Sequence, residues 1–196
     1  MKRLFVIRHG QTTGDLEDRY GGDYDDALSP EGARQVAVLC DEMKDFGIQS
    51  VFSSPLKRAQ QTAQTLAEAA HCHVTTIDGL RERNQYGILT GMTKSEARHQ
   101  YPGLVEQVKD RLQTIQGAES YAAAAERMKR AYHEAVFRLV SCGAIVWHGG
   151  GMRVLFREIL RAGELKEIGD CAWVELHQNN DDTGFFIKNL CRLERL

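Results

Sequence analysis

Short apolar runs alternate along the chain with longer stretches of helical periodicity. Six runs are too short for helices and end at polar or glycine-rich residues, which predicts buried strands. They lie at residues 4–7, 51–52, 74–77, 144–147, 172–176 and 185–190. Between most of them, apolar positions recur three or four residues apart, as one face of a helix requires.

The first predicted helices begin at serine–proline pairs. Ser29 can cap a helix whose first residue is Pro30, and Gly47 closes it. Ser54-Pro55 repeats this pattern. The Gly- and Asp-rich stretch 14–26 predicts a loop before the first of these helices.

Later helices are signalled by caps and periodicity. Thr93 and Glu96 form a potential capping box for a short helix that ends at Pro102. Ser120 predicts the cap of a long helix to about Val140. Further helical faces lie at 104–115 and 154–160.

Strands that alternate with helices predict the fold class. We expect an α/β protein, a single three-layer domain over residues 1–196 with a largely parallel central sheet flanked by helices. Ligands of such sheets bind beyond the carboxyl ends of the strands. Arg8-His9, Ser53-Ser54 and His148 all follow predicted strands at that edge.

Composition excludes several classes. The 27 acidic and 25 basic residues give a net charge of −2, unlike a bulk nucleic-acid binder. The first apolar run is too short for a signal peptide or a membrane span, so we expect a cytoplasmic protein without membrane association. Five widely spaced cysteines without a Cys-x-x-Cys pattern favour free thiols. His71 and His73 lack further ligands nearby, so we expect no metal.

Four motifs carry the candidate chemistry. Arg8-His9-Gly10-Gln11-Thr12 directly follows the first strand, and Ser53-Ser-Pro-Leu-Lys-Arg58 follows the second. Leu80-Arg-Glu82 precedes Tyr86-Gly87, and Trp147-His148-Gly149-Gly150 precedes Arg153. In this order they resemble the signature of the histidine phosphatase superfamily, the phosphoglycerate-mutase-like fold of branch 1. One Arg-His-Gly would be weak, whereas four ordered motifs across nearly the whole chain are specific.

The residue types suit a phosphate dianion. Arg8 and Arg58 can supply forked, permanently charged donors. The helix starts after Ser54 and after His148 would add backbone N–H groups, including that of Gly149. Thr12 belongs to the same predicted phosphate site.

The resemblance implies roles for three residues. His9 would be the nucleophile, attacking as a neutral imidazole whose other ring nitrogen is held by a backbone carbonyl. His148 would stabilise charge on the transferring oxygens. Glu82 would protonate the leaving group and then activate water. This chemistry needs no metal or other cofactor.

The chain departs from the family pattern at one position of the first motif. Asp15 stands where the family usually has asparagine. A carboxylate beside a phosphate is repulsive unless it is protonated or turned away, so contact between residue 15 and phosphate is in doubt.

Substrate contacts are predicted on the leaving-group side of the site. We expect Gly21, Arg83 and Tyr86 there, with residues of about 83–118 forming a helical insertion over the active site. Arg81 and Arg83 should point outward, to substrate or solvent. Lys94 or Arg98 could meet a second anion or be surface charge.

Three functions remain open. We favour hydrolysis of a small-molecule phosphomonoester through a phosphohistidine. The alternatives are cofactor-dependent mutase-type phosphoryl transfer and a catalytically silent, phosphate-binding regulatory protein. Mutases of this family are longer and carry a basic, proline-rich cover, whereas no proline follows Pro102 here. A shorter cover excludes water less well, which favours hydrolysis.

Overall fold

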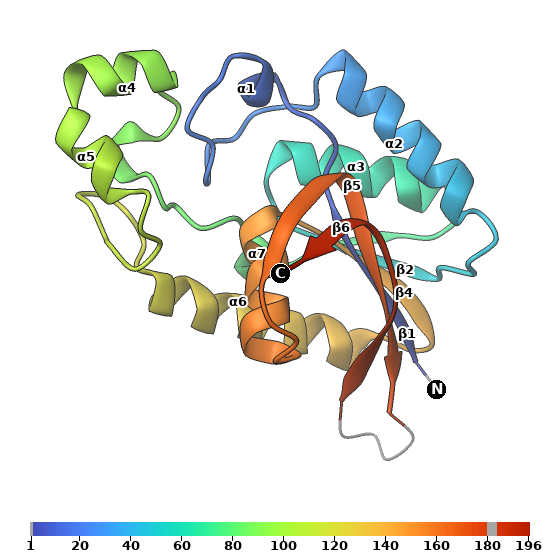
Figure 1. Cartoon of the computed structure of the whole chain (residues 1–196). Coiled ribbons are helices and arrows are strands. Elements are labelled where there is room, and N and C mark those ends of the chain that lie inside the picture. Colours follow the sequence, from blue (N-terminus) through green and yellow to red (C-terminus); the bar gives the residue numbers. More distant parts are fainter. Residues whose placement is uncertain (1, 180–183) are drawn as a thin grey trace.

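One mixed sheet organises the molecule (Figure 1). The computed structural model describes residues 2–179 and 184–196. Its strands are β1 (Arg3–Arg8), β2 (Ser50–Ser53), β3 (Val74–Thr76), β4 (Cys142–Trp147), β5 (Leu165–Gln178) and β6 (Phe185–Arg195). Their order is β3-β2-β4-β1-β5-β6, with the first four parallel and β5 and β6 antiparallel. The predicted α/β fold with a largely parallel sheet is confirmed.

The sheet is covered on both faces. Alternate residues of β1 point to opposite sides: Leu4 and Val6 pack with α6 (Tyr121–Arg138) and α7 (Gly149–Val154). Phe5 and Ile7 pack with α2 (Pro30–Met43) and α3 (Lys57–Ala69). All four β1 side chains are fully buried. The central strand is therefore fixed from both layers.

Three predicted caps are present. The Ser29 hydroxyl accepts from the Gly32 N–H at the start of α2, and Ser120 accepts from Ala123 at the start of α6. Thr93 begins α4 (Lys94–Gln100) with the expected capping box. Each satisfies N–H groups that the first helical turn leaves without partners.

The predicted helix start at Ser54-Pro55 is wrong. Helix α3 begins at Lys57, and its cap residue, Leu56, offers no side-chain hydrogen bond. The Ser54 hydroxyl accepts from the Leu56 N–H at 3.3 Å instead. The Lys57 N–H donates to the Asp25 carboxylate at 2.7 Å. The start of α3 therefore belongs to the loop around Asp25 and not to a free anion site.

The expected loop at 14–26 is also partly helical. Helix α1 (Thr13–Leu16) forms there because Thr12 and Asp15 cap each other: the Asp15 N–H donates to the Thr12 hydroxyl, and the Thr12 N–H to the Asp15 carboxylate. A local reciprocal cap outweighs the loop-forming composition.

The segment 83–118 has a small core of its own. It follows η1 (Asp78–Leu80) and contains η2 (Gly87–Leu89), α4 and α5 (Pro102–Gln107). Its buried residues are Leu89, Ala97, Val105, Val108 and Ile115. Figure 1 shows α4 and α5 set apart from the helices that cover the sheet. The predicted helix over 104–115 ends early, and Leu112 is 64% exposed because no apolar partner faces it.

Two irregularities lie near the carboxyl edge of the sheet. Helix α7 continues into a π-helical turn, η3 (Leu155–Ile159), so the predicted helical stretch 154–160 is present with one widened turn. The register of β5 against β6 shifts between Ile168 and Trp173. There the Cys171 N–H donates to the His9 carbonyl at 3.3 Å.

Within the described ranges, no helix combines the length and the apolar character needed to cross a bilayer.

Candidate active site

The two motif histidines meet at the carboxyl edge of the sheet. β1 and β4 pair in parallel with Arg8 opposite Trp147, so His9 and His148 follow neighbouring strand ends. Their ring centroids are 5.1 Å apart. His9 is 5% exposed and His148 is fully buried. The parallel pairing thus brings together two motifs that are 139 residues apart.

The contacts of His9 define its tautomer. Its Nδ1 lies 2.8 Å from the Gly10 carbonyl, which can only accept, so Nδ1 carries the proton. Its Nε2 accepts from the Arg58 Nε–H at 3.1 Å. Burial, and then the charges of Arg58 and Arg8, hold the pKa of His9 well below its ordinary value. The ring is therefore neutral, with a lone pair on Nε2.

Arg58 is anchored by a residue that the sequence analysis missed. It forms an ion pair with Asp26 at 2.8 Å, with both side chains only 5% exposed. Its remaining Nη donors bind the carbonyls of Gly22 and Tyr24. The expected forked hold of Arg58 on phosphate is not the arrangement in this structure, because the fork faces the 22–26 loop. Only its Nε–H reaches His9.

Arg8 and His148 each keep one buried nitrogen without a partner. The Arg8 Nη groups face the Ile168 carbonyl and the Asp170 carboxylate, the latter at 3.5 Å. His148 Nε2 lies 2.7 Å from the Ser54 hydroxyl. Arg8 Nε and His148 Nδ1 have no hydrogen-bond partner within the described chain. Buried polar atoms are normally satisfied, so two orphaned nitrogens at one place indicate a ligand.

The electrostatics of His148 resemble those of His9. Burial lowers the pKa of His148 well below its ordinary value, and the charge of Arg58 and the nearby His9 add to the effect. Both rings are thus neutral at physiological pH, and the positive charge of the site comes from its arginines.

Glu82 sits at the N-terminus of α7. Its two carboxylate oxygens accept from the backbone N–H groups of Gly150 and Arg83, each at 2.8 Å. A Cβ at position 150 would lie 2.2 Å from Glu82 Oε1. Glycine at 150 is therefore required for the carboxylate to reach this helix end.

Thr12 is buried and its hydroxyl is already engaged. It donates to Asp15 Oδ2 at 2.9 Å and accepts from the Asp15 N–H. The predicted contact of Thr12 with phosphate would require this cap to open. Asp15 directs its carboxylate at its own helix, as the departure from asparagine led us to suspect.

A pocket of about 580 Å³ adjoins this site, with the buried His9 and His148 outside its lining. Arg8, Glu82 and Gly149 line it, and Arg83 and Tyr86 contribute to its wall. Of the predicted substrate-side residues, Gly21 is absent from the lining, and its neighbour Gly22 is present.

Arg83 does not point outward as expected. It is 6% exposed, and its guanidinium donates to the backbone carbonyls of Arg111 and Glu119 at 2.8 and 2.9 Å. It therefore orders the end of the 83–118 segment, because a buried guanidinium needs acceptors around it.

The pocket is strongly basic. Six basic side chains line it against two acidic ones, Glu82 and Asp110. Arg111 belongs to the segment that was expected on the substrate side, whereas Arg157 was not predicted. Lys94 and Arg98, which were left open between a second anion and surface charge, do not line the pocket. Lys94 pairs with Asp18. No periodic or motif signal marks Arg111, whose place depends on the fold of the 83–118 segment.

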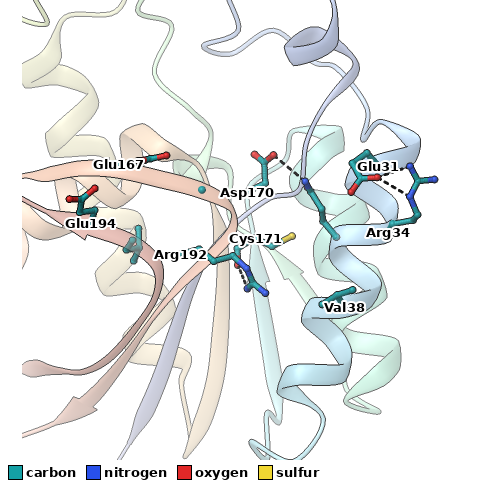
Figure 2. Close-up of a pocket in the computed structure, with 11 residues that line it drawn as sticks. Glu31, Arg34, Val38, Glu167, Asp170, Cys171, Arg192 and Glu194 are labelled. Atoms are coloured by element: carbon teal, nitrogen blue, oxygen red, sulfur yellow. Dashed lines mark hydrogen bonds and ion pairs between the residues drawn. The ribbon is translucent and has the colours of Figure 1, made fainter.

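A second pocket, of about 650 Å³, lies between α2 and the strands β5 and β6. Figure 2 shows Glu31 on α2 across from Asp170, Glu167 and Glu194. Its acidic lining disfavours phosphate, and it holds none of the predicted site residues. We therefore take the basic pocket as the candidate active site.

Among the described residues there is no group of three or more His, Cys, Asp or Glu side chains placed to hold a metal ion. The expectation that no metal is needed stays a prediction.

Comparison with known proteins gives a consistent picture. Residues 4–185 match the histidine phosphatase superfamily (branch 1). The uncharacterized phosphatase PhoE of Bacillus subtilis is 28% identical over 159 residues, 81% of this chain and 78% of that protein. The probable phosphoglycerate mutase GpmB of Proteus mirabilis is 33% identical over 153 residues, 76% of this chain and 66% of that protein.

Solved structures agree with the sequence relatives. A mycobacterial glucosyl-3-phosphoglycerate phosphatase in complex with inorganic phosphate superimposes with a TM-score of 0.78 at 25% identity, covering 96% of each chain. Three mycobacterial relatives at 33% identity are longer proteins, and the chain covers 45% of their length.

Proposed function

Because the chain belongs to branch 1 of the histidine phosphatase superfamily, we propose that it hydrolyses small phosphomonoesters through a phosphohistidine on His9. The observation that carries the proposal is the pair of orphaned nitrogens, Arg8 Nε and His148 Nδ1, beside a neutral His9. Arg8 Nε–H can donate to an oxygen of a bound phosphate, and His148 Nδ1 can do so in the tautomer in which its Nε2 accepts from the Ser54 hydroxyl.

Binding prepares the attack by freeing the lone pair of His9. The Arg58 Nε–H donates to His9 Nε2 before substrate binds. A phosphate oxygen is a stronger acceptor for this N–H than a neutral imidazole nitrogen, because it carries negative charge opposite the guanidinium. The N–H turns to that oxygen, and Nε2 is left free to attack phosphorus.

The transfer then proceeds in two balanced steps. His9 Nε2 forms a bond to phosphorus while the P–O bond to the leaving group breaks, and Glu82 gives its proton to the departing oxygen. In the second step, Glu82 as a carboxylate takes a proton from water, whose oxygen forms a bond to phosphorus while the bond between phosphorus and His9 Nε2 breaks. Inorganic phosphate leaves, and His9 Nε2 regains its lone pair. Deprotonated Glu82 is held by the N–H groups of Gly150 and Arg83.

The compartment is part of the same proposal. An odd number of widely spaced cysteines favours a reducing environment, so we propose that the reaction takes place in the cytoplasm.

The test compares the wild type with His9→Ala on a panel of phosphomonoesters that includes both phosphoglycerates. Free phosphate and isomer interconversion are followed together, and mass spectrometry detects the phosphorylated protein. His99→Ala, on the exposed face of α4, is the matched control. We expect phosphate release by the wild type and the control, and a loss of at least about a thousand-fold in His9→Ala.

Other outcomes would overturn the proposal. Interconversion faster than release would make the protein a mutase. Phosphate binding without turnover would make it a silent regulatory binder.

A further inference from the structure

Three arginines surround one aromatic ring in the candidate active site. The guanidinium carbons of Arg83, Arg111 and Arg157 lie 5.8, 5.7 and 5.9 Å from the centre of the Tyr121 ring. All four residues line the basic pocket. Each cation is attracted to the ring face, but the three repel one another.

Within the described chain, a carboxylate partner offsets the charge of only one of these three arginines. Arg83 uses its donors on backbone carbonyls, and Arg157 pairs with Glu164. The guanidinium of Arg111 makes no hydrogen bond or ion pair within the residues that the structure describes. It lies on the exposed wall of the pocket, over the ring of Tyr121.

Arg153 adds a fourth cation between the two ends of the pocket. It is half-buried on α7, and its guanidinium donates to the Leu165 carbonyl with no carboxylate partner in the described chain. Burial and the charges of Arg157 and Arg8 lower its pKa, while Glu82 raises it. Arg153 is therefore near both the phosphate end and the Tyr121 end.

The pocket is large enough for two separate groups of a substrate. Its volume of about 580 Å³ is in the range that holds whole small molecules rather than one phosphate ion. The hydrolysed phosphate uses the orphaned nitrogens of Arg8 and His148, next to His9. Arg111 and Arg157 are left for another part of the substrate.

We propose that the substrate carries a second anionic group, which binds between Arg111, Arg153 and Arg157. This rests on the proposed function, in which the first phosphate occupies the His9 end. A carboxylate and a second phosphate both match the planar donors of guanidinium, and the test separates them.

Matched esters give the first test. Glycerol 3-phosphate and 3-phosphoglycerate share a three-carbon skeleton and differ in a hydroxymethyl group against a carboxylate. Fructose 6-phosphate and fructose 1,6-bisphosphate test a second phosphate. Their dissociation constants are measured by calorimetry with His9→Ala protein, and kcat/KM with the wild type. We expect the second anion to favour binding by roughly ten- to hundred-fold in at least one pair.

Variants then test which residues cause the preference for the second anion. Arg111→Gln is the most direct change, because Arg111 has no hydrogen bond to lose, and Arg111→Lys keeps its charge. The ratio of dissociation constants within the pair should fall by about ten-fold in Arg111→Gln and largely persist in Arg111→Lys. Arg98→Gln, an exposed arginine of α4 outside the pocket lining, should leave the ratio unchanged.

The results separate this inference from the proposed function. Equal binding within both pairs overturns the second-anion site even if the enzyme hydrolyses every ester. A binding preference that survives Arg111→Gln overturns the assigned residues. A preference that Arg111→Gln removes, with no phosphate release by the wild type, would support the anion site and refute the phosphatase.

Discussion

The two ends of the active-site pocket satisfy their charges in opposite ways. At the inner end, Arg58 is buried against Asp26 and two carbonyls, and His9 is held by Gly10. At the outer end, Arg111 stands without an acceptor in the described chain and Arg153 has only a carbonyl. His9 and Arg58 are thus organised before substrate arrives, with Arg8 Nε and His148 Nδ1 left for phosphate, whereas Arg111 at the outer end has no acceptor in the described chain until a ligand binds. Groups that are held in place before binding lower the activation barrier of the reaction. Charged side chains without a partner determine which ligand binds.

The largest expected effect in this comparison is on catalysis, and it comes from Glu82, the carboxylate that lines the pocket. Glu82→Gln cannot donate the proton to the leaving group, so kcat/KM for alkyl phosphates, which reports the transfer of phosphate to His9, should fall by about 10²- to 10⁴-fold. The fall should be smaller for p-nitrophenyl phosphate, whose leaving group needs no proton. Steady-state kinetics on both ester types checks this, with the exposed Glu106→Gln as control. Equal losses on both esters would mean that Glu82 acts by holding α7 in place.

Substitution in the ion pair of Arg58 and Asp26 should have the next largest effect, here on the free energy of unfolding. Asp26→Asn leaves the charge of Arg58 buried without a partner, and breaking such a pair costs about 3–5 kcal/mol in the free energy of unfolding. Chemical denaturation measures the loss, and added inorganic phosphate should restore part of it. Asp25→Asn removes a neighbouring carboxylate in an exposed pair with Lys57 and should cost less than about 1 kcal/mol. Equal losses in the two variants would contradict the role of Asp26.

The two buried histidines should also make the free energy of unfolding depend on pH, which the outer arginines cannot do. The pKa values of His9 and His148 are lowered in the folded protein, so the unfolded chain takes up protons first. The free energy of unfolding is then fully present above the ordinary histidine pKa of about 6.5 and falls below it. Each histidine contributes a slope of up to about 1.4 kcal/mol per pH unit. Denaturation between pH 7.5 and 5 should show this, and His9→Gln should remove about half of it.

The smallest expected effect is a gain in stability rather than a loss. Arg111→Gln relieves repulsion among the outer arginines, so without ligand it should raise the free energy of unfolding by about 0.2–0.5 kcal/mol at low salt. The gain should vanish at 1 M salt, where charges are screened within a few ångströms. Thermal or chemical unfolding at both salt concentrations provides the test. A loss of stability would show that the contact with the Tyr121 ring outweighs the repulsion.

Locally encoded features were predictable from the sequence. The strand before His9 is a continuous apolar run, and Ser29, Thr93 and Ser120 cap helices through neighbours three residues away. The Ser54 start failed for a tertiary reason, because its hydroxyl lies against His148 and α3 begins at Lys57.

The site was predictable only in part, for a similar reason. The motif residues His9 and His148 could be placed at strand ends, and the structure brings their rings together, with Glu82 in the lining of the adjoining pocket. The partner of Arg58 could not be found, because Asp26 lies 32 residues away in a loop with no periodic signal. The outer arginines depend on how the 83–118 segment packs, which local patterns leave undetermined.

The central place of β1 has a consequence for the order of events during synthesis. The strand that leads to His9 is made before its two neighbours in the sheet, β4 and β5, the second of which ends at Gln178. At about 5–20 residues per second, the nascent chain carries His9 for roughly ten to thirty seconds before both neighbours exist. Until β4 has been made, the apolar run of β1 has no neighbouring strand to pair with, and its other edge stays unpaired until β5 follows. Arg8 Nε and His148 Nδ1 are not yet held together where they could bind a phosphate. The pocket can therefore form only when most of the chain has been made.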